Sequence, residues 1–200
     1  SPLIQNNYLE SQFLWYVNMD FEIRDHLLQG AKQLQSPNSS EREEESDISL
    51  LVIHNISLPP GEYATGFIDQ LFCNQLDSKA HPYFKRIAEL KVSAHLLISR
   101  TGIITQYVPF NRKAWHAGDS VFLGRENCND FSIGIELEGT DYEAFTEEQY
   151  QLLIEVSNEL LKSYPLINRS RIKGHSDIAP GRKTDPGPFF QWDKYLKGLV

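Results

Sequence analysis

The sequence predicts an α/β fold of the α+β kind, a single domain with a mixed central β-sheet flanked by helices. Short apolar segments typical of buried strands occur at 48–54, 92–98, 103–109 and 131–137. The second and third of these flank Arg100–Gly102, which is hairpin spacing and predicts an antiparallel pair. Because this hairpin stands among helical segments, we expect a mixed sheet rather than a doubly wound parallel one.

The N-terminal quarter differs in composition from the rest. Residues 36–47, SPNSSEREEESD, contain five acidic residues and one arginine, a net charge of −4. Such a segment is expected to be a solvated linker or loop. The predicted organisation is therefore an N-terminal extension with an acidic linker at 1–47 and a domain at 48–200.

The remaining elements follow from local patterns. Residues 20–35 fit a short helix, whereas 1–19 show no clear period; the only methionine is Met19, which suggests the hypothesis of a native start there. Residues 66–76, GFIDQLFCNQL, also fit a helix. A longer helix is expected to begin with a capping box at Thr146 and to end before Pro165.

Composition and charge exclude several classes of partner. A formal net charge of −8 without a cluster of Lys and Arg argues against nucleic acid. No apolar segment approaches the roughly 20 residues that span a bilayer, so no membrane partner is expected. Cys73 and Cys128 match neither a zinc knuckle nor a redox motif, and we expect free thiols in a reducing, cytoplasmic compartment. The oligomeric state is not predicted.

Two histidines lie at the ends of predicted elements. His54 closes the strand 48–54, and His175 opens the Gly- and Pro-rich segment GHSDIAPGRKTDPGP, which is expected to be a loop of fixed shape. Two such histidines and one aspartate would form a three-ligand zinc site with an open position. Asp177 and Asp185 both qualify as the third ligand, and Asp177 alternatively braces the loop. A lone strand-end histidine is more often structural.

Charged residues in apolar surroundings are further candidates. Glu136 lies inside the strand FSIGIEL, where an unpaired buried carboxylate costs several kcal/mol, so it must face a cleft, a cation or a hydrogen-bond network. Glu138 shares its face but is nearer the strand end, where it can be solvated. Lys183 is either a surface residue or a cation that stabilises an oxyanion.

Three motifs in order, HNISLPPGEY, RENCNDFSIGIELEGTD and GHSDIAPGRKTDPGP, resemble the AmpD-type 1,6-anhydro-N-acetylmuramoyl-L-alanine amidases of bacterial cell-wall recycling. These enzymes belong to the zinc amidase and peptidoglycan-recognition superfamily, and AWHAG (114–118) adds to the similarity. The resemblance implies one Zn²⁺ held by His54, His175 and Asp185. It also implies that Glu136 is the catalytic carboxylate and that Lys183 stands beside the metal.

The implied reaction is hydrolysis of the amide between the lactyl group of anhydro-muramic acid and L-alanine in a cytoplasmic muropeptide. In bacteria that carry an inducible β-lactamase, loss of this amidase activity can raise expression of the β-lactamase. Asn55 and Trp115 are the candidate substrate contacts; His95 is expected to be structural or to support the site, and His116 could be either. The alternatives are a non-catalytic peptidoglycan-fragment binding protein, an amidase acting on polymeric cell wall, and a structural zinc protein.

Overall fold

The computed structural model describes residues 21–200, so the expectations about residues 1–19, including a start at Met19, lie outside it. Its centre is a six-stranded sheet of order β12-β5-β11-β6-β7-β3. The first four strands are parallel, β7 is antiparallel to β6, and β3 is parallel to β7. Their bounds are β3 Lys32–Gln33, β5 Leu50–Ile56, β6 Leu96–Ile98, β7 Ile104–Gln106, β11 Ser132–Glu138 and β12 Ile172–Gly174.

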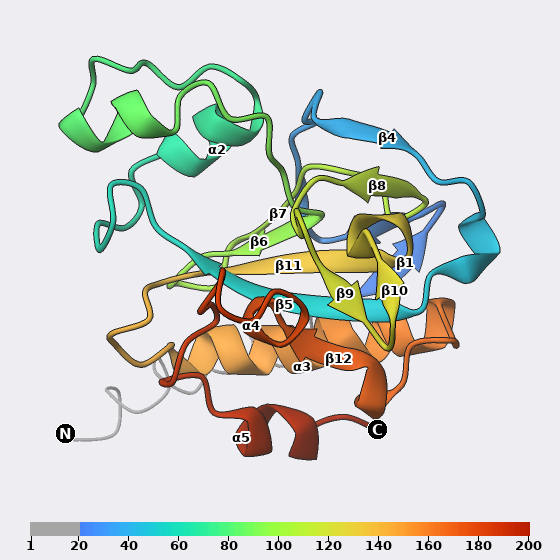
Figure 1. Cartoon of the computed structure of the whole chain (residues 1–200). Coiled ribbons are helices and arrows are strands. Elements are labelled where there is room, and N and C mark those ends of the chain that lie inside the picture. Colours follow the sequence, from blue (N-terminus) through green and yellow to red (C-terminus); the bar gives the residue numbers. More distant parts are fainter. Residues whose placement is uncertain (1–20) are drawn as a thin grey trace, which may run out of the picture.

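Three two-stranded antiparallel sheets and several helices complete the fold (Figure 1). The strands are β1 Glu22–Arg24 with β2 Leu27–Gln29, β4 Ser39–Glu41 with β8 Arg112–Ala114, and β9 Val121–Phe122 with β10 Arg125–Glu126. The α-helices are α2 Phe67–Phe72, α3 Glu147–Ser163, α4 His175–Ile178 and α5 Trp192–Lys197. Short 3-10 helices are η1 Glu45–Asp47, η2 Pro82–Arg86, η3 Cys128–Asp130 and η4 Arg169–Arg171.

The sheet is covered on both faces, which explains why its central strands carry apolar side chains on both faces. Leu51 and Ile53 of β5 join the core that α3 and α5 close, below the sheet in Figure 1. Leu50 and Val52 point the other way, into a second cluster with Phe131. No helix in residues 21–200 is long and apolar enough to cross a bilayer.

Most predicted elements are present. The strands at 48–54 and 131–137, the hairpin of β6 and β7, and the helix at 66–76 are confirmed, although α2 ends already at Phe72. The capping box of α3 is formed by Thr146 and Gln149 as predicted. The mixed sheet flanked by helices confirms the predicted fold class.

The helix predicted at 20–35 is wrong. This segment forms the β1–β2 hairpin, with Asp25 and His26 at φ 52° and 63° in its turn. Leu28 is buried, and its N–H donates to Gln106 Oε1 at 2.7 Å. Pairing with the rest of the domain outweighs the weak helix propensity of this segment.

The prediction that 36–47 is a solvated linker or loop is wrong about its exposure to solvent. Within it, β4 pairs with β8, and Ser36, Asn38 and Arg42 are buried. The Ser36 hydroxyl donates to Phe72 O, and the Asn38 amide donates to Val92 O at 2.8 Å. The net charge of the segment did not predict its burial, because the one arginine among the acidic residues points into the domain.

Two local expectations need smaller corrections. The segment 174–188 is not loop throughout, since it begins with the single-turn helix α4, where Asp177 Oδ2 accepts from Gly174 N at 2.7 Å. His54 does not end its strand, because β5 continues to Ile56.

Candidate metal centre

Strand register brings the first site residues together. In the parallel pair β5–β11, His54 lies directly beside Glu136, and both point away from the α3 face. Gly174, at the end of β12, pairs with Ile53, so the next residue, His175, emerges at the same edge as His54. The carboxyl ends of neighbouring parallel strands are the usual place for an active site in such sheets.

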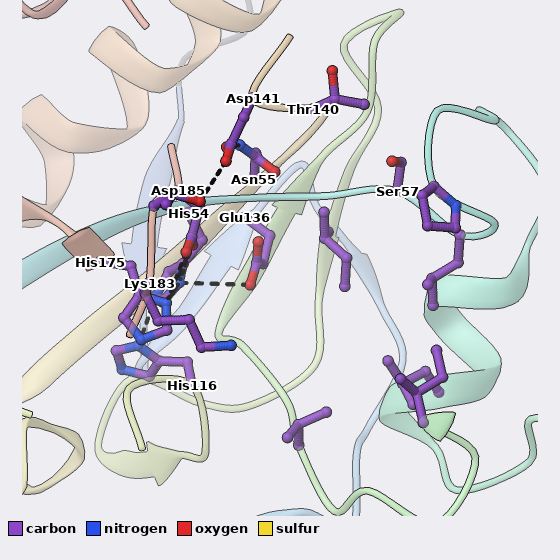
Figure 2. A pocket seen from close by; sticks show the side chains of 18 of the residues that line it. His54, Asn55, Ser57, His116, Glu136, Thr140, Asp141, His175, Lys183 and Asp185 are labelled. Atoms are coloured by element: carbon purple, nitrogen blue, oxygen red, sulfur yellow. Dashed lines mark hydrogen bonds and ion pairs between the residues drawn. The ribbon is translucent and has the colours of Figure 1, made fainter. Parts of the chain in front are cut away.

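His54, His175 and Asp185 converge on one point (Figure 2). The two Nδ1 atoms lie 3.0 Å apart, and Asp185 Oδ2 lies 3.0 Å from His54 Nδ1 and 3.2 Å from His175 Nδ1. Ligand distances of about 2.0–2.1 Å in a tetrahedral zinc site require ligand atoms roughly 3.3 Å apart. The observed triangle therefore matches three corners of such a site.

Hydrogen bonding at the far side of His175 supports a cation at this point. His175 Nε2 lies 2.9 Å from the carbonyl oxygen of Ala117, which can only accept, so Nε2 carries the hydrogen. His175 Nδ1 then presents a lone pair to the carboxylate of Asp185 and to His54. Acceptors packed this closely need a positive charge between them, and His₂Asp is a donor set that Zn²⁺ accepts. The residues present fit the metal.

The carboxyl groups of the site have opposite pKa shifts. Burial alone would raise the pKa of Asp185, but its close contacts with the His175 and His54 rings outweigh burial and hold the pKa below its ordinary range. For Glu136, burial raises the pKa well above 4.5, Asp185 adds to the rise, and Lys183 opposes it. Glu136 Oε2 is buried and has no hydrogen-bond partner among the described residues. Such an atom is placed to meet a water or a substrate.

The three converging side chains open into a groove of about 920 Å³, which suits a ligand larger than a single sugar. Its lining includes the apolar side chains of Leu71, Phe72 and Ile87 as well as the charged side chains of Glu136 and Lys183. Lys183 extends into the groove beside Glu136 (Figure 2). Its charge acts on both His54 and Glu136.

The other sequence candidates have distinct places. Trp115 lines the groove, with its indole N–H donating to Ser40 Oγ at 3.0 Å. Asn55 also lines it, but its amide donates to Asp141 Oδ1 at 2.7 Å and to Pro186 O at 3.0 Å. Asp177 is not one of the three converging residues; its carboxylate accepts from Gly174 N and so braces the loop, the second of the two roles considered for it.

Glu138 and His95 are structural in their contacts. Glu138 is buried rather than solvated. Its carboxylate accepts hydrogen bonds from the backbone N–H groups of Ala64 and Arg100, at 2.9 and 3.1 Å, which take the place of water. His95 Nδ1 accepts from Gly134 N at 3.0 Å and does not contact the three candidate ligands.

Comparison with known proteins adds to this geometry. The sequence pattern of the N-acetylmuramoyl-L-alanine amidases matches residues 44–188. The chain belongs to this amidase family. Its predicted enzyme class and family are thereby confirmed, and the matched residues contain the whole converging cluster.

Individual amidases agree over most of the chain. The 1,6-anhydro-N-acetylmuramyl-L-alanine amidase AmpD of Haemophilus influenzae is 54% identical over 178 residues, which are 89% of this chain and 97% of that protein. A crystal structure of an AmpD derivative superposes with a TM-score of 0.87 at 53% identity, covering 89% of this chain and 99% of the other. AmpDh3 from Pseudomonas aeruginosa, solved in complex with anhydromuramic pentapeptide, gives a TM-score of 0.59 at 27% identity over 76% of this chain and 60% of its own.

One residue that lines the groove, Asp141, was not predicted from the sequence. The carboxylate of Asp141 accepts from Asn55 and, at 2.5 Å, from the hydroxyl of Thr184. Asn55 follows one candidate ligand and Thr184 precedes another, so Asp141 ties the two ligand-bearing segments together. Its position in ELEGTD gives no such signal, because the contact exists only in the folded chain.

Proposed function

We propose that this amidase is a zinc enzyme that hydrolyses the amide between the lactyl group of 1,6-anhydro-N-acetylmuramic acid and L-alanine in soluble muropeptides. The observation that carries the proposal is the convergence of His54, His175 and Asp185 next to a buried carboxylate with an unpartnered oxygen. Similarity to AmpD over nearly the full length of both chains supports the substrate.

Three residues would hold the metal and two would act on the reacting groups. When bound, Zn²⁺ lowers the pKa of a coordinated water toward about 7 and polarises a carbonyl oxygen. Glu136 takes a proton from the attacking water and returns it to the leaving amine of L-alanine. Burial raises its pKa above the ordinary value of a carboxyl group, which suits a group that both accepts and releases a proton. The ammonium group of Lys183 stabilises the negative charge of the tetrahedral intermediate.

The groove offers contacts for the rest of the substrate. The Trp115 indole is proposed to pack against the apolar side of the sugar. Asn55 contributes to substrate binding through the polar rim that it forms with Asp141. We propose a cytoplasmic location in a bacterium, which the two free thiols, Cys73 and Cys128, support.

The test is release of stem peptide from a defined anhydro-muropeptide, followed by mass spectrometry. Cleavage at the lactyl–alanine bond should disappear after chelation and return with Zn²⁺. The matched variants are Asp185→Asn, which should lose zinc and activity, and Asp193→Asn, which makes the same change at an exposed aspartate of α5 and should retain both. Binding without cleavage by zinc-loaded protein would indicate a peptidoglycan-fragment binding protein. Equal cleavage of polymeric cell wall would contradict the preference for soluble muropeptides.

A further inference from the structure

The outer nitrogens of the two histidine ligands meet the same short segment of the chain. His175 Nε2 lies 2.9 Å from Ala117 O, and His54 Nε2 lies 2.9 Å from His116 Nδ1. The backbone N–H groups of His116 and Ala117 both donate to Asn129 Oδ1, at 3.1 and 2.9 Å. A single anchored dipeptide therefore contacts both ligands from behind.

We infer that His116 is a positioning residue that fixes the tautomer and orientation of the zinc ligand His54. This inference rests on the zinc site proposed above. A histidine that binds a metal through Nδ1 carries its hydrogen on Nε2, and that hydrogen needs an acceptor. His54 is 1% exposed, so water does not supply one. The acceptor is the lone pair of His116 Nδ1.

The tautomer of His116 is then determined as well. With Nδ1 accepting, the hydrogen of its neutral ring lies on Nε2, which is 3.0 Å from Ser132 Oγ. The result is a buried chain of donors running from His54 through His116 to Ser132. The rings of His54 and His116 meet edge to face, at 88° and 5.0 Å between centroids, which aligns the two nitrogens.

Strand β11 provides the space for this ring. Ser132, Gly134 and Glu136 are every second residue of the strand and therefore lie on the same face. A Cβ on Gly134 would lie 2.5 Å from His116 Cγ, so the ring occupies the place of the missing side chain. The same face thus holds, in order, the terminal acceptor Ser132, the ring of His116 and the carboxylate of Glu136.

The first test measures Zn²⁺ affinity by competition with a chelating dye. His116→Leu removes the acceptor, and its affinity should fall about 10- to 100-fold, the usual effect of losing such a support. His116→Asn places an oxygen near the position of Nδ1 and should recover most of the affinity. The control His95→Asn makes the same change at another buried histidine that touches no ligand, and it should bind Zn²⁺ like the wild type.

The second test requires no variant and so is independent of folding defects. Nitrogen-15 NMR of the histidine rings in the zinc-loaded wild type should find His116 protonated on Nε2 and His54 protonated on Nε2. A hydrogen on His116 Nδ1, or wild-type affinity in His116→Leu, would overturn the inference. If the wild type itself binds no Zn²⁺ at His54, the proposed function fails instead.

Discussion

Arg42 provides the strongest test of how the acidic segment is built into the domain. Its guanidinium donates five hydrogen bonds to the carbonyl oxygens of Phe110, Asn129, Asp130 and Ser132, at 2.7–3.2 Å. The residue is 6% exposed. Replacement by methionine, Arg42→Met, keeps the length of the side chain and removes every donor.

The expected loss of stability is the difference of two effects. At about 1.5 kcal/mol for each buried carbonyl that loses a charged donor, four carbonyls give about 6 kcal/mol. Against this, burial lowers the pKa of Arg42 from 12.5 to about 10, and methionine removes the corresponding cost of about 3 kcal/mol for burying a charge. The free energy of unfolding should therefore fall by about 3 kcal/mol.

Urea unfolding of the metal-free protein measures this difference. The control is Arg24→Met, the same substitution at an exposed arginine paired with Glu22, which should change stability by less than about 0.5 kcal/mol. If Arg42→Met were as stable as the control, the hydrogen bonds of Arg42 would contribute nothing to stability, and the predicted loss would be refuted.

Three further predictions concern the site and its surroundings. Glu136→Gln should lower kcat by about 10²- to 10⁴-fold while Zn²⁺ affinity in a chelator competition stays unchanged, and a large loss of affinity would contradict a role in proton transfer. Asp141→Ala should lower kcat/KM about 10- to 100-fold in the muropeptide assay, because both ligand-bearing segments lose their tie; Thr184→Val should produce part of this loss, and wild-type kinetics in both would disprove it. Burial, reinforced by the Arg42 charge, lowers the pKa of His95 to about 3, so between pH 6.5 and 3 the unfolded chain binds a proton there that the folded chain does not. His95 alone should accordingly make stability in urea fall with decreasing pH by up to about 1.4 kcal/mol per unit; His95→Asn should lessen the total slope by that amount, whereas an unchanged slope would argue against a neutral buried His95.

The sequence alone determined the features that depend on local pattern. Apolar segments predicted β5 and β11, and the capping box predicted the start of α3. The three motifs predicted the amidase family and, through the resemblance, the residues that converge. These signals can be read from a chain because strand alternation, capping and motif spacing are local properties.

Tertiary structure decided which side chains meet and what each one contacts. Asp177 and Asp185 were equivalent on local grounds, and only the return of the 174–188 segment over β5 places Asp185 against His54. Arg42 likewise contacts residues that are 53 to 90 positions away from it in the chain. His116 and His54, which contact each other, are 62 positions apart. A buried polar group forms its hydrogen bond with whichever partner the fold brings within about 3 Å. Composition and periodicity therefore do not predict which partner that is.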